Sequence, residues 1–279
     1  MSPRELAWRV LTEVDRGKGL ADELLDRLLR RSGLALSWAL SRQTEEGCFY
    51  EIQNLDLPAR WFEDELEHDK PFPCSTVSTA KVAFGLSQAM RKGAPREEHF
   101  VPSLRRFVEW LISMEYPPGS GSFAPREGTP VDCLYANALV AQALASAAAL
   151  LREEGEEPPP EWLDAVRRAV EHNASLQEES GMFPYLGGGG RTVAYTASVA
   201  WCLQNVLRLA GEVDGAEEAV GRACRFLLSK VDPETGALDL SEEDTNMRFL
   251  TVPYFATYSA LLLSLIHISE PTRPRLISY

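Results

Sequence analysis

One pattern recurs along most of this chain of 279 residues, and it limits the folds that the chain can adopt. A helix is followed by a turn that contains a glycine, and the turn is followed by a second helix rich in small residues. Successive glycines lie roughly 55 to 75 residues apart, a spacing that fits one helical hairpin with its connections. The repeat therefore predicts an all-α chain of stacked hairpins. The equivalent positions are Gly47 with Phe49, Gly121 with Phe123, Gly181 with Phe183, and Gly236 with Leu238.

The two helices of each hairpin differ in composition. The second helices, such as residues 136–151, consist mainly of Ala, Ser, Thr and Leu and can pack on all sides. The first helices, such as residues 165–172 and 217–229, carry Arg and Glu on one face and apolar side chains on the other. No alternating strand pattern of useful length appears. We therefore expect an inner ring of second helices inside an outer ring of first helices, the arrangement called an α/α toroid.

Composition and charge limit the partners of the chain. With 45% hydrophobic and 25% charged residues, it can bury a sizeable core. The net charge of −13 argues against binding to nucleic acid or anionic membranes, since phosphates recruit Lys and Arg. The first residues, MSPRELAWRV, are charged where a secretory signal needs an apolar run, and no stretch of about 18 apolar residues occurs. These features predict a cytoplasmic location.

The five cysteines are widely separated and never occur in CxxC spacing. Neither a disulfide framework nor a zinc knuckle is indicated by this pattern. We expect reduced, buried thiols. The cysteines are Cys48, Cys74, Cys133, Cys202 and Cys224.

The turns carry a resemblance to known repeats over residues 35–262. The WxxxxQxxxGxF style of turn is similar to the repeats of terpenoid cyclases, prenyltransferase β subunits and six-hairpin glycosidases. Complete toroids of these families have more hairpins than the four seen here, so the resemblance implies an incomplete, truncated ring. The motif is formed by Trp38, Gln43, Gly47 and Phe49, and again by Gln177, Gly181 and Phe183.

The two ends of the chain resemble other sequences. Residues 3–33 resemble the NusB-type helical domain that opens many ribosomal RNA cytosine methyltransferases, but they supply only two amphipathic helices. We treat residues 1–34 as a separate N-terminal hairpin, either chimeric or a cap. Residues 263–273, LSLIHISEPTR, resemble the translation of a sequencing-library adapter. Residues 263–279 are therefore predicted to be an artefact.

The terpenoid and prenyl chemistries lack their usual residues. Class II terpene cyclases protonate their substrate with an Asp of a DxDDTA motif, whereas residues 75–80 read STVSTA. Prenyltransferases hold zinc through an Asp, a Cys and a His, but Ala256 stands at the His position, and Asp132 with Cys133 alone cannot form the site. We expect no metal and no cofactor. A cyclase-like or prenyltransferase-like protein without these motifs remains a further alternative.

The carbohydrate families need carboxylates at the mouth of the inner ring and aromatic rings on which a sugar can stack. Helix starts of the TVAY type, here residues 192–195, resemble those of toroid proteins from polysaccharide gene clusters. The resemblance implies a saccharide or another small-molecule ligand. The candidates are Asp132 and Asp244 as acid and base, Arg191 as an anchor for a substrate carboxylate, and Tyr185, Tyr195 and Tyr254 as platforms.

Two hypotheses follow for the function. The first is a carbohydrate-processing toroid, either glycoside hydrolase-like or lyase-like. The alternative is a non-catalytic helical-repeat module that binds a partner protein, in which Asp132 and Asp244 only cap helices and the Tyr residues belong to the core. His172 is expected at the surface in both cases. Two carboxylates about 5 to 10 Å apart across one pocket would favour hydrolysis.

Overall fold

The computed structural model describes residues 40–41, 43–49, 74–93, 98–184 and 193–232. These residues form helices joined by turns, with isolated β-bridges and no strand among them, so the prediction of an all-α fold is confirmed. The two terminal segments predicted to be foreign lie outside the described residues. The helices are α3 (Thr76–Arg91), α4 (Phe100–Ser113), α5 (Leu134–Glu153), α6 (Pro160–Ser175), α7 (Val193–Ala210) and α8 (Ala216–Ser229).

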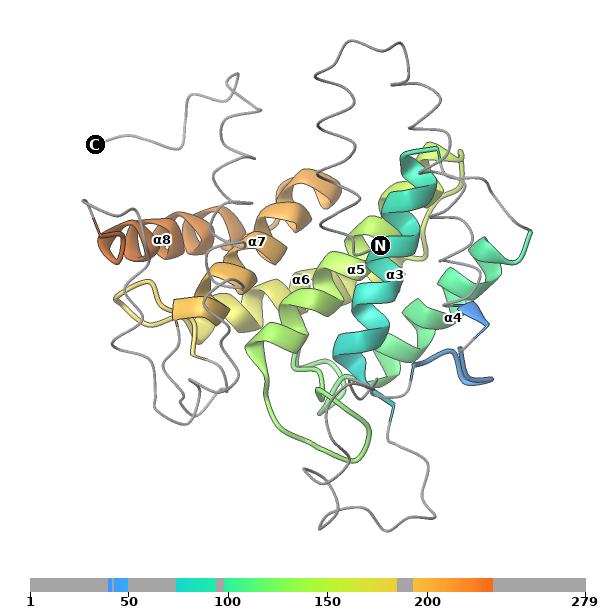
Figure 1. The fold of residues 1–279 in the computed structure, drawn as a ribbon, viewed down its shortest axis with the longest axis horizontal. Helices are drawn as coiled ribbons and strands as arrows, with labels where there is room; N and C mark the ends of the chain where they lie inside the picture. Colours follow the sequence, from blue (N-terminus) through green and yellow to red (C-terminus); the bar gives the residue numbers. More distant parts are fainter. Residues whose placement is uncertain (1–39, 42, 50–73, 94–97, 185–192, 233–279) are drawn as a thin grey trace, which may run out of the picture.

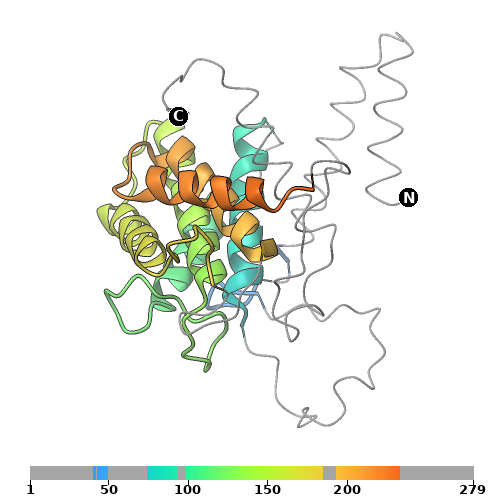
Figure 2. The ribbon, with the colours of Figure 1, turned by 90° about the vertical axis from the view of Figure 1, so that its left-hand side faces the viewer.

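The helices are arranged in two layers, as the repeat predicts. Helix α5 packs between α3 and α7, and these three helices form the inner layer. Helices α4, α6 and α8 form the outer layer, in which α6 contacts both of the others (Figures 1 and 2). The described part of the chain is thus an arc of an incomplete α/α toroid.

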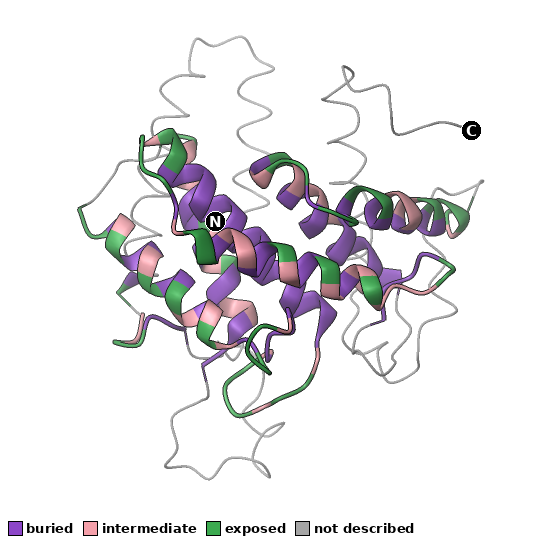
Figure 3. Ribbon diagram, turned by 180° about the vertical axis from the view of Figure 1, so that it is seen from behind, coloured by how far each residue is buried: buried purple, intermediate pink, exposed green. Residues whose placement is uncertain are grey.

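The inner and outer layers differ in how much of each helix is buried. Every residue from 134 to 151 of α5 is buried, because its many Ala side chains let neighbouring helices approach on all sides. Helix α5 is long and apolar enough to cross a membrane by composition, but its apolar stretch is buried inside the protein, as the core helix of a globular domain would be. The outer helices α4 and α6 instead alternate buried and exposed faces (Figure 3).

The repeat glycines are explained by close packing between hairpins. Gly47, Gly121 and Gly181 have φ values of 100°, 77° and 92°, a left-handed region that favours glycine. A Cβ atom at each position would also collide with a backbone carbonyl of the next outer helix. The turn therefore needs glycine for both reasons. The carbonyls belong to Arg106, Arg168 and Arg222, respectively.

The phenylalanine of each turn anchors the inner helix. Its ring is buried, and its backbone N–H donates to a polar side chain near the start of that helix. This link fixes the turn against the inner layer. The pairs are Phe49 with Thr79, Phe123 with Asn137, and Phe183 with Thr196. Gly236 and Leu238 of the fourth turn lie outside the described residues.

The cysteine prediction is wrong for two residues. Cys48 and Cys74 form a disulfide, with Cα atoms 5.9 Å apart. They meet because the first turn folds onto the start of α3, where the Ser75 N–H donates to the Phe49 carbonyl at 2.8 Å. Such a bond is typical of oxidising compartments, so it does not support the predicted cytoplasmic location. Cys133, Cys202 and Cys224 are not in disulfides.

Candidate functional site

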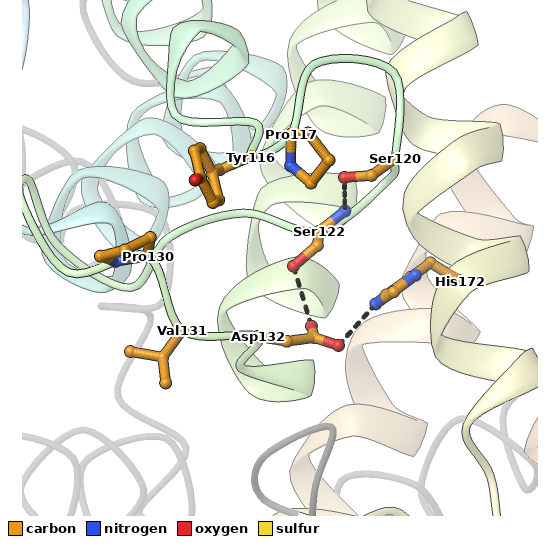
Figure 4. A pocket seen from close by; sticks show the side chains of 8 residues that line it. All are labelled: Tyr116, Pro117, Ser120, Ser122, Pro130, Val131, Asp132 and His172. Carbon is orange, nitrogen blue, oxygen red and sulfur yellow. Dashed lines mark hydrogen bonds and ion pairs between the residues drawn. The ribbon is translucent and has the colours of Figure 1, made fainter.

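An aspartate and a histidine meet at one end of the second hairpin. Asp132 lies just before Cys133, the N-cap residue of α5, and His172 lies in the last turn of α6. Their Oδ2 and Nε2 atoms are 2.8 Å apart. The other carboxylate oxygen, Oδ1, accepts hydrogen bonds from Ser122 Oγ at 2.9 Å and Asn137 Nδ2 at 3.1 Å. Asp132 therefore joins the turn, the inner helix and the outer helix (Figure 4).

Asp132 does not cap α5, so that reading is wrong. The N-cap position belongs to Cys133, and no side chain makes a capping hydrogen bond there. The carboxylate binds side chains instead. His172 is also not the free surface residue that its charged surroundings predict, since it is 22% exposed and bonded to Asp132. The two residues are 40 positions apart, and only the folding of the hairpin brings them together.

The environment of Asp132 favours the charged carboxylate. Partial burial by itself would raise its pKa, because removal from water disfavours the charged form. Hydrogen bonds from His172, Asn137 and Ser122 stabilise the charge more strongly. The pKa of Asp132 is therefore lowered below its ordinary value.

The pair borders a shallow, open pocket of about 280 Å³. Tyr116 lines it with 59% of its surface exposed. Sequence reasoning missed this tyrosine, because it lies in the loop before the glycine rather than at a helix start. The lining consists of Tyr116, Pro117, Ser120, Ser122, Pro130, Val131, Asp132 and His172 (Figure 4).

A partly buried ion pair holds the pocket loop in place. Glu115 is only 8% exposed and binds the Arg168 guanidinium with both carboxylate oxygens, each at 2.9 Å. Its Oε1 atom also accepts the Gly121 N–H at 2.8 Å. Burial acts to raise the pKa of Glu115, but these hydrogen bonds outweigh it and lower the pKa. Since Arg168 lies one helical turn before His172 on α6, the loop and the histidine share one support.

Of the other predicted site residues, only Tyr195 lies within the described ranges, and it does not line this pocket. Tyr195 lies on α7, where its ring packs edge-on against Tyr135 with centroids 5.2 Å apart. No group of three or more His, Cys, Asp or Glu side chains is placed to hold a metal within the described ranges. Four predicted residues lie outside those ranges, and their roles stay predictions. They are Asp244, Arg191, Tyr185 and Tyr254.

Solved structures share the fold at low sequence identity. A possible member of the GH105 family from Salmonella enterica has a TM-score of 0.58 and 13% identity, covering 84% of this chain and 64% of its own. A UGL structure with dGlcA-Glc-Rha-Glc has a TM-score of 0.61 and 12% identity, covering 95% and 74%. An ent-copalyl diphosphate synthase from Streptomyces platensis has a TM-score of 0.50 and 20% identity, covering 81% and 36%.

These likenesses establish the fold alone. They confirm the α/α toroid that the turn motif predicts, and they include both the glycosidase and the terpenoid cyclase families named from that motif. The chain spans 64% of the length of the first of these structures. No protein-family model and no curated protein matches the sequence.

Proposed function

We propose that this chain is a carbohydrate-processing α/α toroid, in which His172, oriented by Asp132, acts as a general base on a bound saccharide. The observation that carries the proposal is the 2.8 Å contact between the two side chains at the edge of an open pocket. Tyr116 supplies an exposed ring on which the apolar face of a sugar can stack. The toroid fold of solved glycosidase structures supports the same ligand class.

The lowered pKa of Asp132 determines which residue of the pair would transfer a proton. A general acid needs a proton near neutral pH, and Asp132 holds its proton too weakly for that role. We infer that Asp132 stays charged and orients His172 by accepting a hydrogen bond from Nε2. The imidazole then has Nδ1 available to take a proton from a sugar hydroxyl, from water or from a sugar carbon.

The test is turnover of a saccharide panel by variants of the pair. Asp132→Asn and His172→Gln should each lower kcat/KM by about a hundredfold or more, the usual contribution of a general base. Reducing ends would report bond cleavage, and ultraviolet absorption of a new double bond would separate elimination from hydrolysis. Full activity in Asp132→Asn would overturn the proposal.

A matched control lies on the same helix as His172. Asp164 pairs with Arg167 at 2.8 Å, but this ion pair is about half exposed and lies away from the pocket lining. Asp164→Asn removes the same charge from the protein. It should leave kcat/KM unchanged, so that any loss in Asp132→Asn can be assigned to the pocket rather than to net charge.

One observation favours the alternative of a non-catalytic binding module. Asp132 is the only carboxylate that lines the described pocket, whereas most glycosidases use two. Its three hydrogen bonds also make it an effective brace between elements. A module of this kind would show no turnover with any saccharide, and Asp132→Asn would lower its melting temperature without other effect.

A further inference from the structure

Two fully buried asparagines lie behind the Asp132 pocket. Asn137 is on α5 and Asn173 is on α6, and neither side chain is exposed to solvent. The Asn137 Nδ2 group donates one hydrogen bond to Asp132 Oδ1 at 3.1 Å and another to Asn173 Oδ1 at 3.2 Å. Because Asn173 directly follows His172 on α6, this one amide connects the carboxylate with the helical turn that carries the histidine.

The hydrogen bonds of these asparagines fix their orientation. Asn137 Oδ1 accepts the Phe123 N–H at 2.7 Å, and Asn173 Nδ2 donates to the Leu134 carbonyl at 3.0 Å. The Asn137 amide cannot be reversed, since the Phe123 N–H needs an acceptor and the Asp132 carboxylate needs a donor. It is therefore held by three partners in one orientation.

Neither asparagine is required by the repeat. Where α5 carries Asn137, the first and third hairpins carry a threonine, whose hydroxyl accepts the N–H of the turn phenylalanine in the same way. Where α6 carries Asn173, five residues after the arginine whose carbonyl meets the turn glycine, both hairpins carry a buried leucine. The equivalent residues are Thr79 and Thr196 on the inner helices, and Leu111 and Leu227 on the outer helices.

The first and third hairpins show that a threonine and a leucine are sufficient at these positions. A buried amide costs free energy unless it is fully hydrogen-bonded, whereas a leucine in the core needs no such partner. The second hairpin nevertheless uses two amides, and it is the hairpin in which Asp132 meets His172. Their role is therefore expected in the site rather than in the fold.

We propose that Asn137 and Asn173 are positioning residues, which set the direction of the Asp132 carboxylate and thereby align His172 for proton transfer. This inference rests on the proposed function, because it concerns the alignment of the same pair. Both asparagines are fully buried and neither lines the pocket, so neither can touch a bound ligand. Their effect should therefore appear in kcat rather than in KM.

The test is a double variant, Asn137→Thr with Asn173→Leu, which gives the second hairpin the residues of the other two. Its melting temperature should change by no more than about 4 °C, since the threonine keeps the bond to Phe123 and the leucine needs no partner. With a saccharide that the wild type turns over, kcat should fall by about tenfold or more, because catalysis is sensitive to small misplacements. KM should stay within about twofold. Unchanged kcat would overturn the proposal.

A measurement without substrate decides the inference even if the proposed reaction fails. The ¹⁵N NMR shift of His172 Nε2 reports the hydrogen bond that this atom makes with Asp132. In the double variant it should move from the wild-type value towards that of Asp132→Ala, in which the bond is absent. A shift identical to that of the wild type would contradict the proposal.

Two further variants separate positioning from stability. Asn137→Thr alone removes the amide that binds Asp132 and leaves α6 unaltered, so it should show the same change at His172 if the double variant fails to fold. Thr79→Ala removes the equivalent hydrogen bond to Phe49 in the first hairpin. It should lower the melting temperature but leave kcat and the His172 shift unchanged. Equal losses of kcat in Thr79→Ala and in the double variant would show a general effect of stability and would rule out a positioning role.

Discussion

The second turn of the repeat differs from the first and third, and the pocket lies at the second. In the first and third turns, a glutamine stands four residues before the glycine and donates to its carbonyl. In the second turn a glutamate, Glu115, takes the place of this glutamine, and it stands six residues before the glycine. An arginine of the next outer helix binds this position in all three turns. The pairs are Gln43 with Arg106, Glu115 with Arg168, and Gln177 with Arg222.

The longer spacing of the second turn is what builds the pocket wall. Tyr116, Pro117 and Ser120 all fall between Glu115 and Gly121 and line the pocket. The residue after the glycine also differs, since Ser122 binds Asp132 whereas Cys48 forms a disulfide and Met182 is buried. The shared contacts hold the ring together, and the residues that depart from the repeat form the candidate site.

The largest effect is expected where the three turns agree. Gly121→Ala would force a side chain into the left-handed region and against the Arg168 carbonyl. We expect the free energy of unfolding to fall by roughly 3 kcal/mol or more. Chemical denaturation measures it. Gly128→Ala is the control, because Gly128 has φ 72° but nothing within 4 Å of an added Cβ. Its cost should be only about 1 kcal/mol. Equal costs would refute the packing explanation of the repeat glycines.

A smaller effect is expected where the second turn departs from the others. Glu115→Gln places the glutamine of the first and third turns into the second. It removes the buried charge opposite Arg168, and we expect a loss of about 2 kcal/mol at neutral pH. Denaturation at a series of pH values measures both this loss and its dependence on protonation.

The pH dependence has a definite sign. The pKa of Glu115 is lower in the folded protein than its ordinary value of 4.5, so its contribution is complete above that value. It is lost as the pH falls through the lower, folded pKa. The wild type should therefore lose stability on acidification from about pH 5 downwards, and Glu115→Gln should lose less. Parallel pH profiles for both proteins would rule out Glu115 as a source of acid sensitivity.

The fold was accessible to sequence reasoning, but most of the site was not. Gly47, Gly121 and Gly181 recur because each turn packs against a backbone carbonyl of the next outer helix. The same steric constraint requires glycine in each copy, so it is visible in the sequence. Asp132 could be selected because an acidic residue at a helix start is visible in the sequence. His172 could not, because its role depends on an approach across 40 residues. Sequence spacing alone does not report contacts of that kind.

The disulfide and the exposed tyrosine escaped prediction for related reasons. Cys48 and Cys74 are 26 residues apart and follow no spacing rule, so only the docking of the first turn onto α3 pairs them. Tyr116 lies in the inserted part of the second turn, which has no counterpart in the first and third turns. A repeat predicts what its copies share, and it carries no information on the residues that interrupt it.

The smallest effect should come from Ser122, the residue that links the second turn to the pocket. Ser122→Ala removes one of three hydrogen bonds to Asp132, and the expected cost is about 1 kcal/mol of stability. The pKa of Asp132 should rise towards its ordinary value, because Ser122 is one of the groups that lower it. Carboxyl NMR titration measures that shift, with Ser180→Ala in the third turn as the control. Ser180 accepts the Met182 N–H but does not contact the pocket carboxylate, so this variant should leave the titration of Asp132 unchanged. An unaltered titration in Ser122→Ala would mean that His172 and Asn137 alone set the charge of the pocket, and the departure at position 122 would then matter only for the shape of the turn.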